Sequence, residues 1–226
     1  MSRSSLRKFI EPLLADFQQI ETDTAAEYLK DCTKVLDAAC GTGSFLEKLR
    51  DKDVIGVDLN QTSVEYCKAQ GLNAIVGSIL DLPFEDETFD GVHCSHVIQN
   101  FSPNEAAQLM REFGRVLKPN GLLVISTMNW FPRFFRHPEF SRPYPPDAIT
   151  RYFVQQKRDS SPTHDNMPYF EQVSIWFRRQ PLIEFHSFRS HKARRVCSAL
   201  NRLQYRFFLR RYWSFDAYTM CLKKIS

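Results

Sequence analysis

The stretch VLDAACGTGSFLEKL, residues 35–49, decides the fold because strand, turn and helix patterns follow one another in it. Apolar residues lead into Asp37, a turn of small residues with two glycines comes next, and a helical pattern begins at Gly43. A glycine-rich turn between a strand and a helix lets the backbone approach a ligand closely at a helix N-terminus. The stretch therefore predicts a ligand site at the carboxyl end of a buried strand.

The alternation of strand and helix patterns continues along the chain. Apolar runs of strand length occupy 35–38, 54–57, 74–76, 91–94 and 122–127. Helical patterns occupy 43–50, 62–69 and 104–117, and residues 5–30 predict one or two further helices. The helix over 104–117 should stop at the turn sequence KPNG, residues 118–121. This order predicts an α/β fold with a parallel sheet, helices on both faces and right-handed crossovers.

The composition is that of an ordinary globular domain. The chain has 226 residues, of which 43% are hydrophobic and 25% are charged, and this length fits one domain with a full core. No apolar run of membrane-spanning length and no secretory signal is visible, so a cytoplasmic protein is expected. Six cysteines are scattered without a C-x-x-C pair. We therefore expect reduced thiols and no metal site.

Charge is divided unevenly between the two halves of the chain. Residues 1–130 hold 12 Lys and Arg against 19 Asp and Glu, whereas residues 131–212 hold 16 against 6. An acidic first half is thus followed by a basic second half, which favours an anionic partner for the latter.

The acids near the turn narrow the choice of ligand. Asp58 ends a second strand pattern, VIGVD, where a carboxylate can accept both hydroxyls of a ribose. A dinucleotide turn would carry a third glycine at a fixed offset, and Asp37 would repel a diphosphate. A nucleoside with a sulfonium and an ammonium group fits better, and S-adenosylmethionine carries both.

Four ordered blocks then show a family resemblance: VLDAACGTG, VIGVDLN, GSILDLPFEDETFDGVHCSHVIQNF and REFGRVLKPNGLLVIST. Over roughly residues 33–128 the sequence resembles the class I S-adenosylmethionine-dependent methyltransferases, in particular those of ubiquinone and menaquinone biosynthesis. The resemblance returns at FDAYTMCLKK and does not cover 129–212. It implies a doubly wound, seven-stranded, mostly parallel Rossmann-like sheet with an antiparallel last strand and a helical, basic insertion. It also implies a single domain over 1–226.

The resemblance carries specific residues over to cofactor-binding roles. The methionine loop would comprise Asp37, Ala39, Gly41, Thr42 and Gly43. Asp58 would hold the ribose, Leu59 would pack on the adenine, and Ser78 and Ile79 would lie at the adenine edge, with Ser95 near the methionyl end. Two positions depart from the family pattern. Ala39 replaces a glycine, and Ser78 stands where an acid or amide is more usual.

His96, directly after the fourth strand pattern, is the candidate catalytic base. Methyl transfer from a sulfonium mainly needs an aligned acceptor, and sometimes a base that deprotonates it. A packing or substrate-orienting role for His96 is the alternative. Cys40 and Cys94 lie in apolar surroundings, where structural thiols are expected.

The acceptor is expected to be a small or lipid-like molecule, because no Asp-Pro-Pro or Asn-Pro-Pro motif follows the fourth strand. Residues 129–212 should form an aromatic and cationic cap over the acceptor. Within them, 191–213 predicts a basic amphipathic helix with an apolar stripe at Val196, Leu200, Leu203 and Phe207. Structural cover, an anionic acceptor, an anionic membrane surface that would place the protein at its periphery, and RNA all remain open for this helix. An RNA-modifying enzyme and a non-catalytic cofactor-binding protein are the alternative functions.

Overall fold

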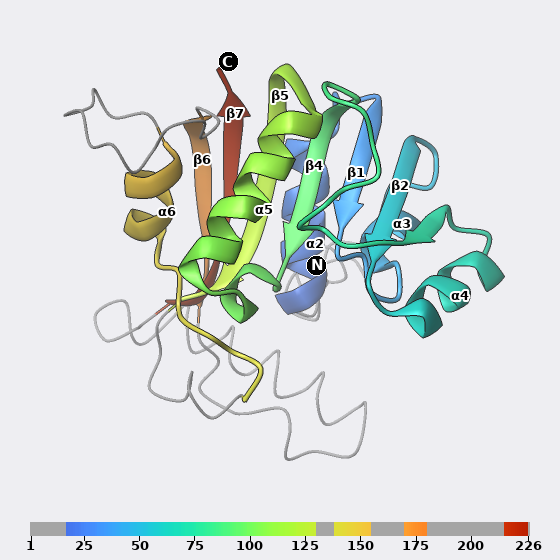
Figure 1. Cartoon of the computed structure of the whole chain (residues 1–226), viewed down its shortest axis with the longest axis horizontal. Helices are drawn as coiled ribbons and strands as arrows, with labels where there is room; N and C mark the ends of the chain where they lie inside the picture. Colours follow the sequence, from blue (N-terminus) through green and yellow to red (C-terminus); the bar gives the residue numbers. More distant parts are fainter. Residues whose placement is uncertain (1–16, 130–137, 155–169, 180–214, 226) are drawn as a thin grey trace, which may run out of the picture.

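A twisted sheet of seven strands forms the centre of the computed structural model, which describes residues 17–129, 138–154, 170–179 and 215–225 (Figure 1). The strands are β1 (Lys34–Ala38), β2 (Asp53–Asp58), β3 (Ala74–Val76), β4 (Phe89–Ser95), β5 (Leu117–Met128), β6 (Phe170–Arg179) and β7 (Phe215–Lys224). Their order in the sheet is β3-β2-β1-β4-β5-β7-β6. Neighbours from β3 to β5 pair in parallel, and β7 runs antiparallel to both β5 and β6. The predicted doubly wound sheet with an antiparallel last strand is confirmed.

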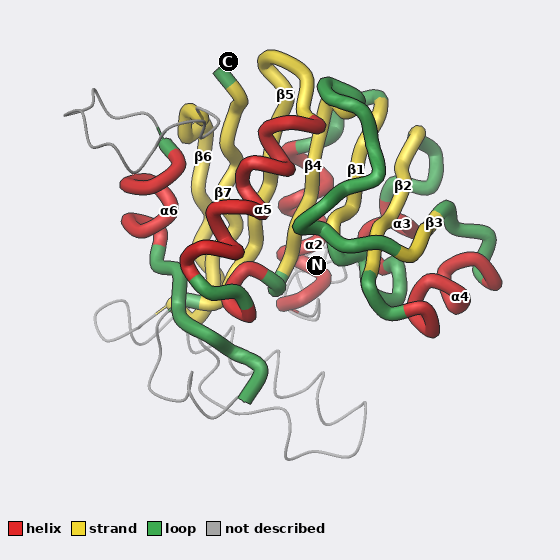
Figure 2. Tube along the Cα trace, viewed as in Figure 1, coloured by secondary structure: helices red, strands yellow, loops and turns green. Residues whose placement is uncertain are grey.

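Helices connect β1 to β2, β2 to β3 and β4 to β5, whereas a loop connects β3 to β4 (Figure 2). The helices are α2 (Phe17–Tyr28), α3 (Ser44–Lys48), α4 (Gln61–Ala69), the short 3-10 helix η1 (Ile98–Asn100), α5 (Pro103–Val116) and α6 (Pro146–Phe153). Asn60 caps α4 by accepting from the amides of Thr62 and Ser63. Ser102 and Glu105 form a reciprocal capping box at the start of α5. These caps satisfy amides that lack partners inside a helix, which explains where both helices begin.

Alternate residues of the central strands enter two different hydrophobic clusters. Leu36 of β1 belongs to the cluster that includes α5 and α6, whereas its neighbour Val35 belongs to the cluster with α2, α3 and α4. On β5, Ile125 and Val124 divide in the same way. Successive side chains of a strand point to opposite faces, so each face of the sheet is covered by its own set of helices. Asp37, two residues after Val35, therefore faces the α2 and α3 side.

The KPNG sequence ends a helix as predicted but lies inside a strand, which the strand prediction for 122–127 missed. Helix α5 ends at Val116, and β5 begins at once at Leu117. A register shift between Phe89 and Gly91 of β4 accommodates the extra residues. Asn120 takes a left-handed φ of 65° there, which is the kind of local irregularity that defines a β-bulge. The KPNG sequence therefore does mark the end of the helix, but the bulge keeps these residues within strand β5.

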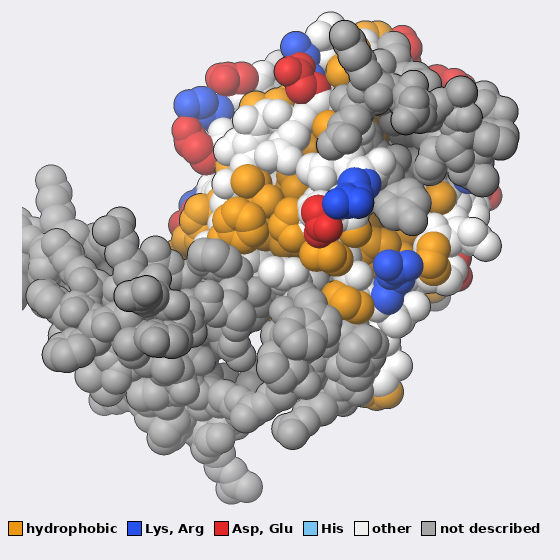
Figure 3. Space-filling model, turned by 90° about the vertical axis from the view of Figure 1, so that its left-hand side faces the viewer, with side chains coloured by type: hydrophobic (Ala, Val, Ile, Leu, Met, Phe, Trp, Pro, Cys, Tyr) orange, Lys and Arg blue, Asp and Glu red, His pale blue; other side chains and the backbone are white. Residues whose placement is uncertain are grey.

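The second half of the chain is described only in part. It contains α6 and the edge strand β6, both within the range 129–212 that was predicted to form a cap. Figure 3 shows this side of the molecule, where hydrophobic side chains form a band among the described residues, and Val173 of β6 is 55% exposed. The predicted basic helix at 191–213, together with residues 1–16 and Cys197, lies outside the described residues. None of the helices in the described ranges combines the length and the apolar character that a membrane crossing requires.

Candidate functional site

A cavity of about 210 Å³ opens beside the carboxyl ends of β1 and β4. Its lining comes from α2, from β1 and the turn after it, from α3, and from the end of β4. The lining residues are Glu21, Thr22, Asp37, Ala39, Cys40, Gly41, Thr42, Ser44, Phe45, His93, Ser95 and His96. Ligands of open parallel sheets bind at this edge. Six predicted site residues, Asp37, Ala39, Gly41, Thr42, Ser95 and His96, thus meet in one cavity.

Asp37 and His93 form a buried pair that lines this cavity. They are register partners on the neighbouring strands β1 and β4, and Asp37 Oδ1 lies 2.7 Å from His93 Nδ1. Both residues are almost fully buried. Phe45 of α3 stacks on the His93 ring with 3.7 Å between the ring centroids. The pair gives each buried polar group a partner, which is what burial requires.

His96 is held rigidly in a backbone conformation that is unusual for histidine. Its φ of 54° lies in the left-handed region. Its amide donates to the carbonyl of Ser126 over 2.8 Å, and its carbonyl accepts from Gln99 Nε2 over 2.7 Å. Non-glycine residues in this region are uncommon and cluster at functional sites. The chain after β4 therefore places His96 at the cavity in a strained backbone conformation.

Glu21 of α2, another lining residue of the cavity, is hydrogen-bonded to the His96 ring. Its Oε2 lies 2.9 Å from His96 Nε2 and 3.2 Å from Nη1 of Arg178, which comes from β6. Burial alone would raise the pKa of Glu21, but the hydrogen bond with His96 and the charge of Arg178 outweigh it and hold that pKa below its ordinary value. Glu21 is therefore a carboxylate at neutral pH, although it is only 2% exposed.

The turn after β1 brings backbone rather than side chains to the cavity. Gly41 has a φ of 52°, and a Cβ added there would meet no atom within 4 Å, so open space lies next to it. A Cβ on Gly43 would instead lie 2.7 Å from Leu72 and 2.9 Å from Cys67. Gly43 therefore allows close packing of the turn on α4 and lies outside the cavity lining. Ala39 also has a left-handed φ, 63°, which is strained for alanine.

The residues predicted to bind the adenosine part of the cofactor form a separate region that does not line the cavity. Asp58 accepts the Gly41 amide over 2.8 Å and the Asn60 amide over 2.9 Å, so it braces the turn. Leu59 is 78% exposed beside it. Ser78 lies in the loop after β3, where its hydroxyl accepts from the Leu80 amide over 3.2 Å, and its neighbour Ile79 is 7% exposed.

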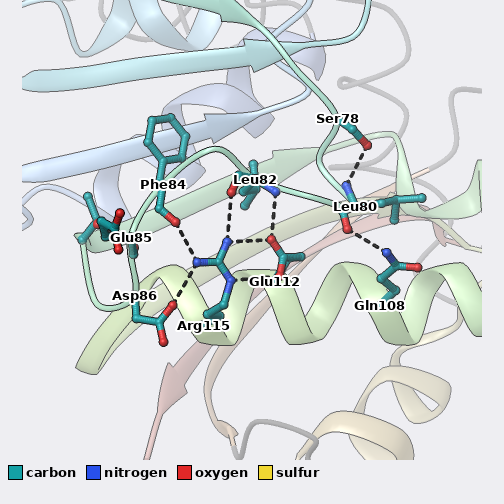
Figure 4. A network of polar contacts seen from close by, with 10 residues as sticks. Ser78, Leu80, Leu82, Phe84, Glu85, Asp86, Gln108, Glu112 and Arg115 are labelled. Atoms are coloured by element: carbon teal, nitrogen blue, oxygen red, sulfur yellow. Dashed lines mark hydrogen bonds and ion pairs between the residues drawn. The ribbon is translucent and has the colours of Figure 1, made fainter.

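Arg115 of α5 fastens this loop to that helix (Figure 4). Its guanidinium donates to the carbonyls of Leu82 and Phe84 over 3.0 and 2.7 Å, and it pairs with Glu112 and Asp86. Glu112 in turn accepts the Leu82 amide over 2.8 Å. The LPFED segment of the third sequence block therefore has a structural role, because its backbone is fixed by one arginine.

The thiols near the cavity do not suit nucleophilic chemistry. Burial raises the pKa of Cys40 and of Cys94, and Asp37 raises both further. The five described cysteines are all buried and unbridged. A buried thiol with a raised pKa is a poor nucleophile, which agrees with the structural role predicted for Cys40 and Cys94.

Sequence reasoning missed Glu21, Phe45 and His93, together with Thr22 and Ser44. Glu21 lies in a helix upstream of every recognised block, and His93 lies within a run that was assigned only as a strand. One signal was available for His93, namely a polar residue in the middle of an otherwise apolar strand. No comparable signal marks Glu21 among the acids of α2.

The residues present fit S-adenosylmethionine. Carboxylates at Glu21 and Asp37 suit its cationic end, and the open position beside Gly41 leaves room for close backbone approach. Each oxygen of Asp58 accepts only one amide, so both keep capacity for ribose hydroxyls. The cavity is smaller than the roughly 300–1,000 Å³ typical of whole-ligand pockets. It therefore suits the methionine end, with the adenosine outside it near Leu59.

The chain is similar to known methyltransferases in sequence. The family described as "Methyltransferase domain" matches residues 36–125. The demethylmenaquinone methyltransferase of Symbiobacterium thermophilum is 29% identical over 66% of this chain and 68% of that protein. The probable methyltransferase PMT19 of Arabidopsis thaliana and the human probable tRNA methyltransferase 9B are each 32% identical over 64% and 50% of this chain. The chain spans only 21% and 26% of their respective lengths.

The fold is also similar to that of a solved methyltransferase over nearly the whole chain. A SAM-dependent methyltransferase from Archaeoglobus fulgidus superposes with a TM-score of 0.63 at 22% identity, covering 99% of this chain and 100% of that one. The strand order, the cavity at the carboxyl edge and the matching domain agree with one another. Together they show that the chain contains a region similar to the methyltransferase domain family and has the seven-stranded Rossmann-like fold of class I S-adenosylmethionine-dependent methyltransferases.

Proposed function

We propose that the protein transfers a methyl group to a small-molecule acceptor that enters the cavity beside His96, and that His96 takes the acceptor's proton. The observation that carries this proposal is the hydrogen bond between His96, which directly follows β4, and the buried carboxylate of Glu21. S-adenosylmethionine, when bound, supplies a methyl group made electrophilic by its sulfonium. The protein then has to align the acceptor and, where the acceptor is an O–H or N–H group, remove one proton.

The hydrogen bond to Glu21 decides which nitrogen of His96 can act as the base. An ionised carboxylate only accepts hydrogen bonds, so His96 Nε2 must carry the proton that points to Glu21 Oε2. In the neutral form of the ring, Nδ1 then holds the free lone pair. Among the described residues Nδ1 has no hydrogen-bond partner. A carboxylate that fixes the tautomer of a histidine in this way is a common device for a general base.

A small-molecule acceptor is supported by the small size of the cavity and the burial of its charged groups. Its charged groups, Glu21 and Asp37, are buried, and His96 has a side chain that is 26% exposed. The similarity to a protein named demethylmenaquinone methyltransferase, over two thirds of both chains, supports the same class of acceptor.

The His96→Ala variant tests the base. We expect kcat to fall by about 100-fold or more, because general base catalysis contributes roughly that factor, while the affinity for S-adenosylhomocysteine stays unchanged. The assay supplies cofactor with a deuterated methyl group to small-molecule and RNA fractions of a cell extract and follows the label by mass spectrometry. Label in a small molecule, lost in His96→Ala, is the expected result. A kcat within threefold of wild type would leave His96 only a packing or orienting role.

An RNA acceptor is the second candidate, favoured by the similarity to a human protein named probable tRNA methyltransferase 9B and by the excess of Lys and Arg over 131–212. In the same assay this candidate predicts label in the RNA fraction. It also predicts RNA binding that weakens steeply as salt rises. Membrane docking by residues 191–213 stays a prediction.

A further inference from the structure

Two side-chain contacts join helix α2 to the edge strand β6 on one face of the sheet. Phe177 of β6 packs against the core cluster that includes α5 and α6, so its neighbour Arg178, and Ser174 with it, point to the opposite face. On that face the hydroxyl of Tyr28 donates to Ser174 Oγ over 3.0 Å. Nη1 of Arg178 lies 3.2 Å from Glu21 Oε2. Of the two contacts, the one made by Arg178 involves a residue that lines the cavity, Glu21.

Arg178 and His96 share one oxygen atom of Glu21. Oε2 lies 2.9 Å from His96 Nε2 as well as 3.2 Å from Arg178 Nη1. The side chains of Glu21 and Arg178 are only 3% and 14% exposed, so water screens their charges weakly. Among the described residues, Arg178 is the one lysine or arginine that pairs with Glu21. The remaining acidic and basic side chains of the cavity lining, Asp37 and His93, pair with each other.

The positive charge at Oε2 controls where the protons of this cluster lie. Burial raises the pKa of Glu21, but the hydrogen bond with His96 and the charge of Arg178 hold that pKa below its ordinary value. Like-charge repulsion disfavours a second cation at the same oxygen, so the ring of His96 donates to it as a neutral group. Without Arg178, either Glu21 takes a proton and donates it to Nε2, or the ring becomes protonated at both nitrogens. Each of these changes removes the lone pair from Nδ1.

We propose that Arg178 is a positioning residue: by sharing Oε2 of Glu21, it holds His96 as a neutral ring that is protonated at Nε2 and has its lone pair on Nδ1. Arg178 acts through Glu21 and needs no contact with the acceptor or the cofactor. The inference rests on the proposed role of His96 as the base, which requires that lone pair. It gives an arginine from the second half of the chain a part in a site whose lining comes from the first half.

NMR of the protein with ¹⁵N-labelled histidine tests the inference, because protonated and unprotonated ring nitrogens give different signals. The spectra are recorded at about pH 8, above the ordinary histidine pKa of about 6.5, and the His96 signals are those absent from His96→Ala. In the wild type His96 should be protonated at Nε2 and unprotonated at Nδ1. Arg178→Met, which removes the charge and keeps an unbranched side chain, should lose this form. Arg178→Lys restores the charge and should keep it.

Tyr28→Phe is the matched control, because it removes the other contact between α2 and β6 and leaves Glu21 untouched. It should keep the His96 signals of the wild type, whereas a merely structural role of Arg178 in docking β6 would make the two variants alike. If Arg178→Met does not fold, Arg178→Gln replaces it, because it removes the charge and keeps an N–H donor, and the same outcomes apply.

The inference would be overturned if the Nε2-protonated form were kept in the uncharged variant, lost in Tyr28→Phe as well, or missing from the wild type. These signals require no acceptor, so the result is separate from the turnover test of the proposed function. Full turnover in His96→Ala would remove the base and leave the effect of Arg178 on the ring in place.

Discussion

The two ends of strands β1 and β4 both carry a carboxylate cluster, but only one cluster is complete. At the amino end, Asp90 accepts from the amides of Thr33 and Lys34 over 2.9 and 3.2 Å, from the Thr33 hydroxyl, and from Lys118. At the carboxyl end, Glu21 leaves one buried oxygen without a partner. The complete cluster holds the strands together, whereas the incomplete one lines the cavity and fixes His96 there.

The largest effect should come from the buried pair at the carboxyl end. Substituting His93→Leu leaves Asp37 buried without its partner, so the free energy of unfolding should fall by about 3–5 kcal/mol. Urea unfolding measures it. Lys48→Ala is the control, because it breaks the half-exposed pair with Asp23 and should cost about 1 kcal/mol or less. Equal losses of unfolding free energy in the two variants would show that the buried pair of Asp37 and His93 contributes no more to stability than the half-exposed pair of Asp23 and Lys48.

Asp58→Ala should weaken cofactor binding and also lower stability, because Asp58 accepts the amides of Gly41 and Asn60. Asp58 is predicted to accept two ribose hydroxyls, and a hydrogen bond to a charged group contributes roughly 1.5–3 kcal/mol. Calorimetry should therefore show S-adenosylhomocysteine binding weakened by about 10-fold to 100-fold. Asp90→Ala is the matched control at the other end of the strands, where stability should fall and affinity should not. Unchanged affinity in Asp58→Ala would remove the ribose assignment.

Low pH should reduce the stability that Asp90 contributes at the amino ends of β1 and β4. Burial alone would raise the pKa of Asp90, but Lys118 and the hydrogen bonds from Thr33 and Lys34 hold it well below its ordinary value. The stability that Asp90 contributes is therefore complete above the ordinary carboxyl pKa of about 4 and is lost as pH falls through the folded value.

Unfolding free energies measured at about pH 6 and about pH 3 test this effect, since the wild type should lose more than about 1 kcal/mol beyond any loss in Asp90→Asn. An identical pH dependence in the variant would show that Asp90 is not the group responsible.

Ala39→Gly should give the smallest effect and the opposite sign. Ala39 holds a left-handed φ of 63° in the turn, and glycine adopts this conformation without strain. The unfolding free energy should rise by about 0.5–1 kcal/mol. Ala38→Gly, one residue earlier in the buried strand β1, is the control and should lower it. A loss of stability in both variants would mean that the turn is not strained.

Local patterns predicted β1 to β4, most of β5, the turn after β1 and half of the cavity, because these depend on residues close together in the chain, whereas β7 was expected only from the family resemblance and no pattern marked β6. Glu21 and Arg178 could not be predicted as a pair, since 157 residues separate them and the contact needs β6 beside the finished sheet. The pairing of Asp37 with His93 depends on strand register, which no single block reveals. The bulge at Asn120 likewise arises from pairing with β4 rather than from the turn sequence itself.

A crystal structure of the protein with bound S-adenosylhomocysteine tests most directly the claim that the cavity is the methyl-transfer site. The homocysteine part should lie in the cavity with its sulfur facing His96, and the ribose hydroxyls should bind Asp58 next to Leu59. A ligand bound elsewhere, or bound with its ribose away from Asp58 and its sulfur outside the cavity, would contradict this account.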